Sequence, residues 1–205
     1  MADLTAKDIQ RLRQQAGVGM MDAKKALTDA SGDFDAALDL LRERGLAKAA
    51  KRSGRAAGEG TIGSYIHVQN GHPVMGVLVD LACETDFVAK SPEFNETATN
   101  IALHISWANP LWVTKDQVDE AALAKEKDLI EREAKAAGKP DAALERIVDG
   151  KLGKFFEENV LYEQAFVNKE AFEGTVGDMV GRLASKMGEN ISVRRFSRIS
   201  VEDDE

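Results

Sequence analysis

The sequence predicts an α+β fold, in which three short helices precede a small antiparallel sheet packed by further helices. Apolar side chains recur at helical spacing through the first 45 residues. Residues 61–83 instead alternate around Asn70-Gly71, a dipeptide typical of two-residue hairpin turns. Highly charged, helix-forming residues then fill 115–137. With 205 residues, 43% of them hydrophobic, the chain can bury a core without disulfide support.

The first 45 residues should form a bundle of three helices. Thr5 is placed to cap the first helix, which ends at the glycine-rich segment 17–19. The second helix should run from about 21 to 30, and Asp33 should cap a third that ends at Gly45. Because helices this short are marginal in isolation, they must pack against one another.

A basic segment, residues 46–58, follows the bundle. It contains no acidic residue and four cations: Lys48, Lys51, Arg52 and Arg55. Such a segment is either a solvated connector or a tether that faces a partner or RNA. We therefore predict a three-helix domain over residues 1–45, a basic linker over 46–58 and an α+β core over 59–205.

The core should contain about three antiparallel strands. Residues 61–68 and 73–83 flank the hairpin turn. The second run is nearly all apolar, which is typical of a central strand covered on both faces. Residues 191–201 alternate imperfectly and predict the third strand. Between these strands, Ser91-Pro92 is a typical helix start.

Two further helical features are predicted in the core. Residues 115–156 should form two helices joined at the break 138–140, which gives an antiparallel helical hairpin. Thr175 should cap the last helix, and Gly188 should end it.

Composition excludes several classes of protein. No apolar run approaches 18 residues, so no membrane-spanning helix is expected, and no signal peptide is apparent. The single cysteine, Cys83, excludes an internal disulfide and suits the cytoplasm. Residues 1–55 carry a net charge of +3 and residues 56–205 one of −11, which disfavours general binding to nucleic acid. Accordingly, Trp107 and Trp112 are expected to pack on the turn between them instead of stacking on bases.

Motifs for a cofactor, a metal ion or covalent catalysis are weak. Residues 58–63 match the string G-x-G-x-x-G, but the string precedes a predicted strand instead of following one, so we expect a hinge. The three histidines lack metal-ligand spacing. Asp80, Glu84 and Asp86 could serve a hydrolytic site with a hard cation, yet no nucleophile is matched to them. We therefore expect neither a cofactor nor an enzyme.

Two apolar features are suited to recognition. Met20 and Met21 stand together at a predicted helix start, where only one of them can point fully inward. Asp86 and Phe87 lie between the apolar strand and the helix that begins at Ser91, and an aromatic anchor beside an acid is typical of a binding hot spot. Two alternatives stay open: that both methionines are core residues, and that Phe87 folds back onto the core.

Four ordered segments resemble the elongation factor Ts family. Gly-Val-Gly-Met-Met-Asp-Ala-Lys-Lys-Ala-Leu at 17–27 is similar to its N-terminal signature, where position 23 is commonly cysteine, and residues 41–52 continue it. Thr-Asp-Phe-Val-Ala-Lys at 85–90 resembles the second signature. Residues 154–167 resemble a late segment in which Ala165 replaces the family's proline. The resemblance covers nearly the whole chain.

The resemblance implies a guanine-nucleotide exchange factor that binds the GDP-bound form of the translation GTPase elongation factor Tu, displaces magnesium and promotes GDP release. It also implies a ubiquitin-associated-like fold for the three-helix domain. Three positions in that domain match family contacts with the GTPase: Arg13, Met20 and Met21. Four match the segment that enters the GTPase near its magnesium and phosphates: Thr85, Asp86, Phe87 and Val88.

Assembly and partners follow from the same resemblance. Longer members of the family carry two core subdomains and a C-terminal helical module, whereas one core is predicted here. Short members form homodimers, which implies a homodimer and a two-plus-two complex, with the edge strands or a face of the small sheet available for pairing. Neither a membrane nor nucleic acid is expected as a partner. The alternative function is a ubiquitin-associated-type adaptor that binds polypeptides without promoting exchange.

Overall fold

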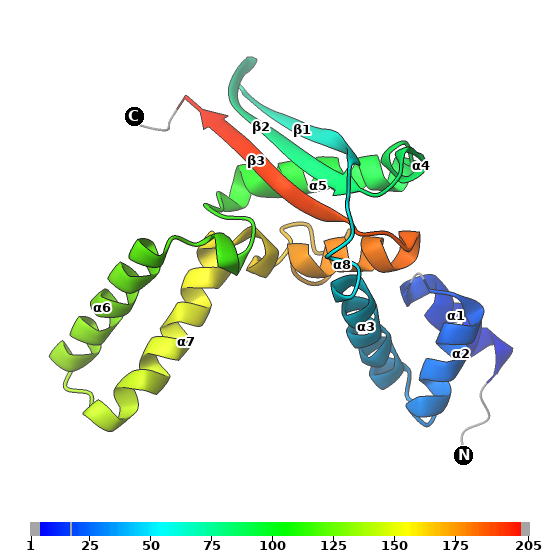
Figure 1. Cartoon of the computed structure of the whole chain (residues 1–205), viewed down its shortest axis with the longest axis horizontal. Coiled ribbons are helices and arrows are strands. Elements are labelled where there is room, and N and C mark those ends of the chain that lie inside the picture. The colour runs from blue at the N-terminus through cyan, green and yellow to red at the C-terminus, as the bar shows by residue number, and fades with distance from the viewer. Residues whose placement is uncertain (1–4, 17, 202–205) are drawn as a thin grey trace. The chain divides into compact units, whose positions relative to one another are not determined.

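The computed structural model describes residues 5–16 and 18–201 and shows the predicted α+β fold (Figure 1). The chain divides into two compact units. One holds the chain up to Thr61 with Leu81–Thr97 and Asp178–Ser192. The other holds Ile62–Asp80, Ala98–Gly177 and the chain from Val193 onward. Within the described part, no helix is long and apolar enough to cross a membrane.

Three helices form the predicted N-terminal bundle: α1 (Ala6–Ala16), α2 (Met20–Asp29) and α3 (Phe34–Ala50). Thr5 caps α1 reciprocally, because the Asp8 N–H donates to Thr5 Oγ1 at 3.2 Å while the Thr5 N–H donates to Asp8 Oδ2 at 3.2 Å. Alanines and leucines contribute equally to the buried core of the bundle, which comprises Leu12, Ala23, Ala26, Leu27, Ala37 and Leu41. Gly17 lies outside the described residues.

The third helix is longer than predicted. We expected it to end at Gly45, which is wrong, because α3 continues to Ala50. Residues 46–50 are Leu-Ala-Lys-Ala-Ala, strong helix formers that outweigh the cost of one interior glycine, about 1 kcal/mol. Gly45 also lies against helix α8 (Val176–Met187), since a Cβ at this position would stand 3.5 Å from Ser185 Oγ.

The sheet has the order β1-β2-β3, with β1 over Glu59–Gln69, β2 over His72–Cys83 and β3 over Ser192–Ser200. As predicted, the apolar strand β2 is central and β3 completes the sheet. Asn70 (φ +51°) and Gly71 (φ +83°) both adopt the left-handed conformation that a two-residue hairpin turn requires. Coverage of both faces of β2 holds only at its end, because Leu81–Cys83 are buried whereas Leu78 is exposed.

Glycines at the start of β1 allow close backbone approach. A Cβ at Gly60 would overlap the backbone carbonyl of Leu81, and one at Gly63 would overlap that of Ala98 in helix α5 (Pro92–Ala108). The G-x-G-x-x-G string therefore begins a strand that packs tightly. The last two glycines of the string, Gly60 and Gly63, are enclosed by neighbouring backbone.

The remaining helices follow the predicted course. A 3₁₀ turn, η1 (Lys115–Gln117), precedes α6 (Glu120–Ala136) and α7 (Asp141–Asn159), which pair as a hairpin around Ile130, Val148 and Leu152. Gly138 (φ +71°) makes the break between them. A second 3₁₀ turn, η2 (Leu161–Glu163), follows, and Gly188 (φ +76°) ends α8. The two 3₁₀ turns and the single helical turn α4 (Asp86–Ala89) were not predicted.

Candidate partner-binding site

Strand β2 leads directly into the first candidate surface. Its last residue, Cys83, is buried, and the chain then leaves the core through Glu84 to the turn α4. Thr85 is the N-cap of α4: its backbone is extended (φ −125°, ψ 154°), and its Oγ1 accepts a 3.5 Å hydrogen bond from the Val88 N–H. Helix α5 begins immediately afterwards, so the turn is bounded by a buried strand and a buried helix.

Phe87 points away from the core. Its side chain is 83% exposed, so the alternative that it folds back is wrong. Thr85 and Asp86 are exposed beside it, and Val88 is half-buried. A large aromatic side chain on an ordered turn is usually at least partly buried. When it is exposed, as Phe87 is, it is typical of an interface anchor.

Asp86 carries a negative charge next to Phe87. Lys90 Nζ lies 2.6 Å from Asp86 Oδ2, one helical turn away. The hydrogen bond and the charge of Lys90 lower the pKa of Asp86 below its usual value. Since both side chains are largely exposed, the pair adds little to stability.

The second candidate surface lies on the N-terminal bundle. Arg13 is exposed in α1, while Met20 and Met21 begin α2 and are 48% and 76% exposed. We expected one methionine to point fully inward, which is wrong for both. Met20 stands at helical spacing from Ala23 and Leu27, but the buried residues of α2 begin one turn later, at Ala23. The bundle therefore offers two flexible apolar side chains to a partner.

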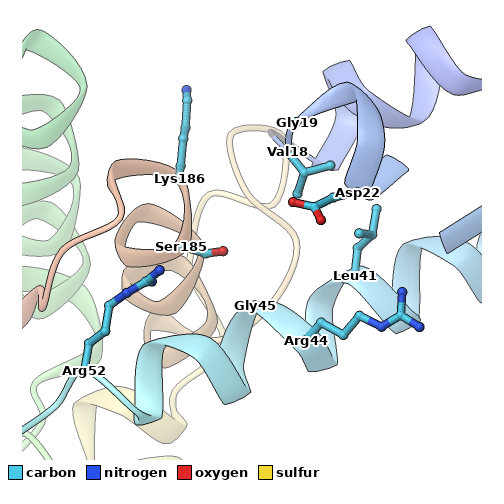
Figure 2. A pocket seen from close by; sticks show the side chains of 9 residues that line it. All are labelled: Val18, Gly19, Asp22, Leu41, Arg44, Gly45, Arg52, Ser185 and Lys186. Carbon is cyan, nitrogen blue, oxygen red and sulfur yellow. The ribbon is translucent and has the colours of Figure 1, made fainter. Parts of the chain in front are cut away.

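A small polar pocket of about 130 Å³ lies between α2, α3 and α8 (Figure 2). Three cations line it, Arg44, Arg52 and Lys186, against one acid, Asp22. Each cation already has a partner: Arg44 binds Asp29, Lys186 binds Glu93, and Arg52 donates to the Ala184 carbonyl. No sequence pattern predicts this pocket, because its lining residues come from three distant segments.

Comparisons with known proteins identify the family of this chain. A model of the family described as Elongation factor TS matches residues 46–173. The chain is similar to the protein named Elongation factor Ts of Thermosipho melanesiensis, with 46% identity over 97% of this chain and 98% of that protein. It is likewise similar to those of Alkaliphilus oremlandii (48%; 97% and 89%) and Solidesulfovibrio magneticus (45%; 100% and 100%). This chain belongs to the elongation factor Ts family. Its role is accordingly guanine-nucleotide exchange on elongation factor Tu in translation elongation.

The signature residues of the elongation factor Ts family fall on two sets of elements. Thr85, Asp86, Phe87 and Val88 share the turn at α4. Arg13 lies on α1, and Met20 and Met21 lie on α2. The structure leaves the side chains of Phe87, Met20 and Met21 exposed.

The carboxylates considered for a hydrolytic site have other partners in this elongation factor Ts family member. Asp80 lies 3.3 Å from Arg194 Nη1 and 3.4 Å from Arg195 Nε. Glu84 accepts from the Asn190 N–H, and Asp86 pairs with Lys90. Among the described residues, no group of three or more His, Cys, Asp or Glu side chains is placed to hold a metal ion.

Trp107 is also more exposed than expected for this elongation factor Ts relative. Trp112 packs against Phe155, with ring centroids 6.1 Å apart, but Trp107 is 78% exposed. The expectation that Trp107 packs on the turn is wrong, because the buried face of α5 is already occupied by Phe94, Ile101 and Ile105. Trp107 therefore offers a natural control for the effect of removing an exposed aromatic side chain.

Proposed function

We propose that this chain accelerates GDP release by inserting Asp86 and Phe87 beside the magnesium and phosphate site of elongation factor Tu. The observation that carries the proposal is the 83% exposure of Phe87 on a capped turn. The chain acts by binding alone, in the cytoplasm, and needs no cofactor and no covalent step. Its own residues favour the GTPase conformation in which the site for GDP is distorted.

The required free energy needs more than one contact. By linkage, an exchange factor weakens nucleotide binding as much as nucleotide weakens binding of the factor. A ten-thousandfold weakening corresponds to about 5.5 kcal/mol. Burial of one phenylalanine contributes about 2–3 kcal/mol. A second surface must supply the rest, and we assign it to Arg13, Met20 and Met21 on the three-helix bundle.

Asp86 has a distinct role in this proposal. It is exposed and carries the negative charge of an ordinary carboxylate at neutral pH. A carboxylate brought next to a bound magnesium ion and phosphates changes the local charge balance on which both depend. Phe87 opens the space and Asp86 perturbs the metal, so the two neighbouring residues act on different parts of one site.

Stopped-flow release of a fluorescent GDP analogue from elongation factor Tu tests this function. We expect the chain to accelerate release strongly in the presence of magnesium and much less when a chelator has already removed the metal. Equal acceleration under both conditions would contradict magnesium displacement. Complex formation without any acceleration would instead favour the alternative, an adaptor that uses the exposed methionines of its bundle.

We also propose that the chain is a homodimer that forms a two-plus-two complex with the GTPase. One face of the β1-β2 hairpin is apolar, because Ile62, Ile66 and Leu78 are each more than half exposed. Ile66 and the β2 residue Gly76 are neighbours on this face, since a Cβ at Gly76 would lie 3.3 Å from Ile66 Cδ1. A second copy of the chain would bury this surface, which a monomer leaves in water.

A further inference from the structure

The turn that carries Phe87 is held by residues far away in the sequence. Glu189 and Asn190 follow Gly188, where α8 ends, and Glu189 is 105 residues from Glu84. Both contact the segment between β2 and α4. We call these two residues the Glu189–Asn190 clamp.

Glu189 binds the start of α4 through both carboxylate oxygens. Oε2 accepts hydrogen bonds from the backbone N–H groups of Glu84 (2.9 Å) and Thr85 (3.1 Å). Oε1 accepts from Thr85 Oγ1 at 2.6 Å. Because the Thr85 hydroxyl gives its hydrogen to Glu189, its oxygen lone pairs are free to accept from the Val88 N–H and cap the turn.

Asn190 extends the same clamp to the segment that follows α3. Its backbone N–H donates to Glu84 Oε1 at 2.6 Å. Its Nδ2 donates to the carbonyls of Arg55 (2.7 Å) and Ser53 (3.3 Å). The side chain is nearly buried, so these bonds are shielded from water. Arg55 Nη1 also lies 3.4 Å from Glu84 Oε1, which closes a small network.

We propose that Glu189 is a positioning residue for nucleotide exchange, because it presets the turn that presents Phe87. A helical turn of four residues is not stable by itself, since helix nucleation is unfavourable. Charge-assisted hydrogen bonds from Glu189 order it before the GTPase is met. Without them, ordering of the turn would have to occur during insertion and would oppose it. This inference rests on the proposed insertion of Phe87.

Two substitutions of Glu189 test whether its hydrogen bonds position the turn: Glu189→Ala removes them, and Glu189→Gln keeps a side chain of the same length. We expect Glu189→Ala to speed amide hydrogen exchange at residues 84–88 while β2 and α5 stay protected. The maximal rate of GDP release should fall roughly tenfold, the loss of about one charge-assisted hydrogen bond, with little change in the half-saturating concentration. Glu189→Gln keeps an oxygen acceptor for the two N–H groups and should restore most of both readouts. Glu170→Ala removes an exposed carboxylate elsewhere and serves as the matched control.

Three outcomes decide the inference. Unchanged protection of the amides at residues 84–88 in Glu189→Ala would overturn the inference. The inference would also be overturned if Glu189→Ala lost this protection but kept the maximal rate of GDP release, while Phe87→Ala released GDP slowly. If Phe87→Ala is also undiminished, the insertion of Phe87 itself is wrong. Should Glu189→Ala fail to fold, Glu189→Asp keeps the charge but shortens the reach to the Glu84 and Thr85 N–H groups, and the inference then requires the same loss of protection and maximal rate in that variant.

Discussion

At the residue scale, the proposed function rests on apolar side chains that the fold leaves exposed to solvent. Phe87 is the clearest, because its neighbours Cys83 and Phe94 are fully buried while its own ring is in water. Removing the ring should therefore affect binding chemistry far more than stability. Asp86 beside it forms an ion pair with Lys90.

The ion pair between Asp86 and Lys90 leads to a prediction about the pKa of Asp86. The pKa of Asp86 is lowered by Lys90, so the pair is intact above the ordinary carboxyl pKa and is lost as pH falls through the lowered value. We expect Lys90→Met to raise the pKa of Asp86 towards its ordinary value, as followed by NMR of the side-chain carboxyl carbon. An Asp86 pKa unaffected by Lys90→Met would show that another group holds the charge.

At the scale of elements, close approach and buried polar bonds fix the core. Gly63 lets β1 lie against the backbone of α5. Buried His104 joins α5 to the segment after η2: its Nε2 lies 3.0 Å from Gln164 Oε1, and its Nδ1 accepts from the Val167 N–H at 3.3 Å. Because Nδ1 is an acceptor, the proton of the neutral ring is on Nε2.

Gly63→Ala tests the close approach. The added methyl group would overlap the Ala98 carbonyl, so the free energy of unfolding should fall by about 1–3 kcal/mol, measured by denaturant titration. Gly150→Ala is the control, since nothing lies near that position inside α7, and it should stabilise by up to about 1 kcal/mol. Equal effects of the two substitutions would refute the packing argument.

His104 predicts acid sensitivity. Burial lowers the pKa of His104, an effect that the hydrogen bond with Gln164 partly opposes. The unfolded chain therefore binds a proton more readily, so stability is complete above the ordinary histidine pKa and decreases as pH falls below it. The free energy of unfolding should decrease between pH 7.5 and 5.5, and His104→Asn should flatten that slope, as a test of this one buried ring. An unchanged slope in His104→Asn would reject this assignment.

Much of this element structure could be predicted from sequence, because local signals agreed with the fold. Asn70-Gly71 and Ser91-Pro92 are signals of that kind. The extension of α3 and the turn α4 could not, since the first depends on helix propensity overcoming Gly45 and the second on Glu189, more than a hundred residues from Thr85. The exposure of Phe87, Met20 and Met21 could not be predicted either, because the spacing of apolar residues does not determine which of them are buried.

At the scale of the whole molecule, assembly is the main prediction. Sedimentation should show wild-type chain at twice its 22.3 kDa mass, and Ile66→Asp should yield a folded monomer by placing a charge in the apolar face of the hairpin. Leu129→Asp alters an exposed leucine of α6 and should leave the dimer intact. A monomeric wild type, or an Ile66→Asp variant that remains dimeric, would exclude this face as the contact.

The central claim is that the exposed side chain of Phe87 drives nucleotide release, and Phe87→Ala tests it most directly. Maximal GDP release from elongation factor Tu should be measured by stopped flow for the wild type, Phe87→Ala and Trp107→Ala, with unfolding free energies in parallel. We predict that Phe87→Ala loses about 2–3 kcal/mol of transition-state stabilisation, which slows release roughly 30- to 150-fold at unchanged stability, while Trp107→Ala is nearly silent. Release by Phe87→Ala at the wild-type rate would contradict the account.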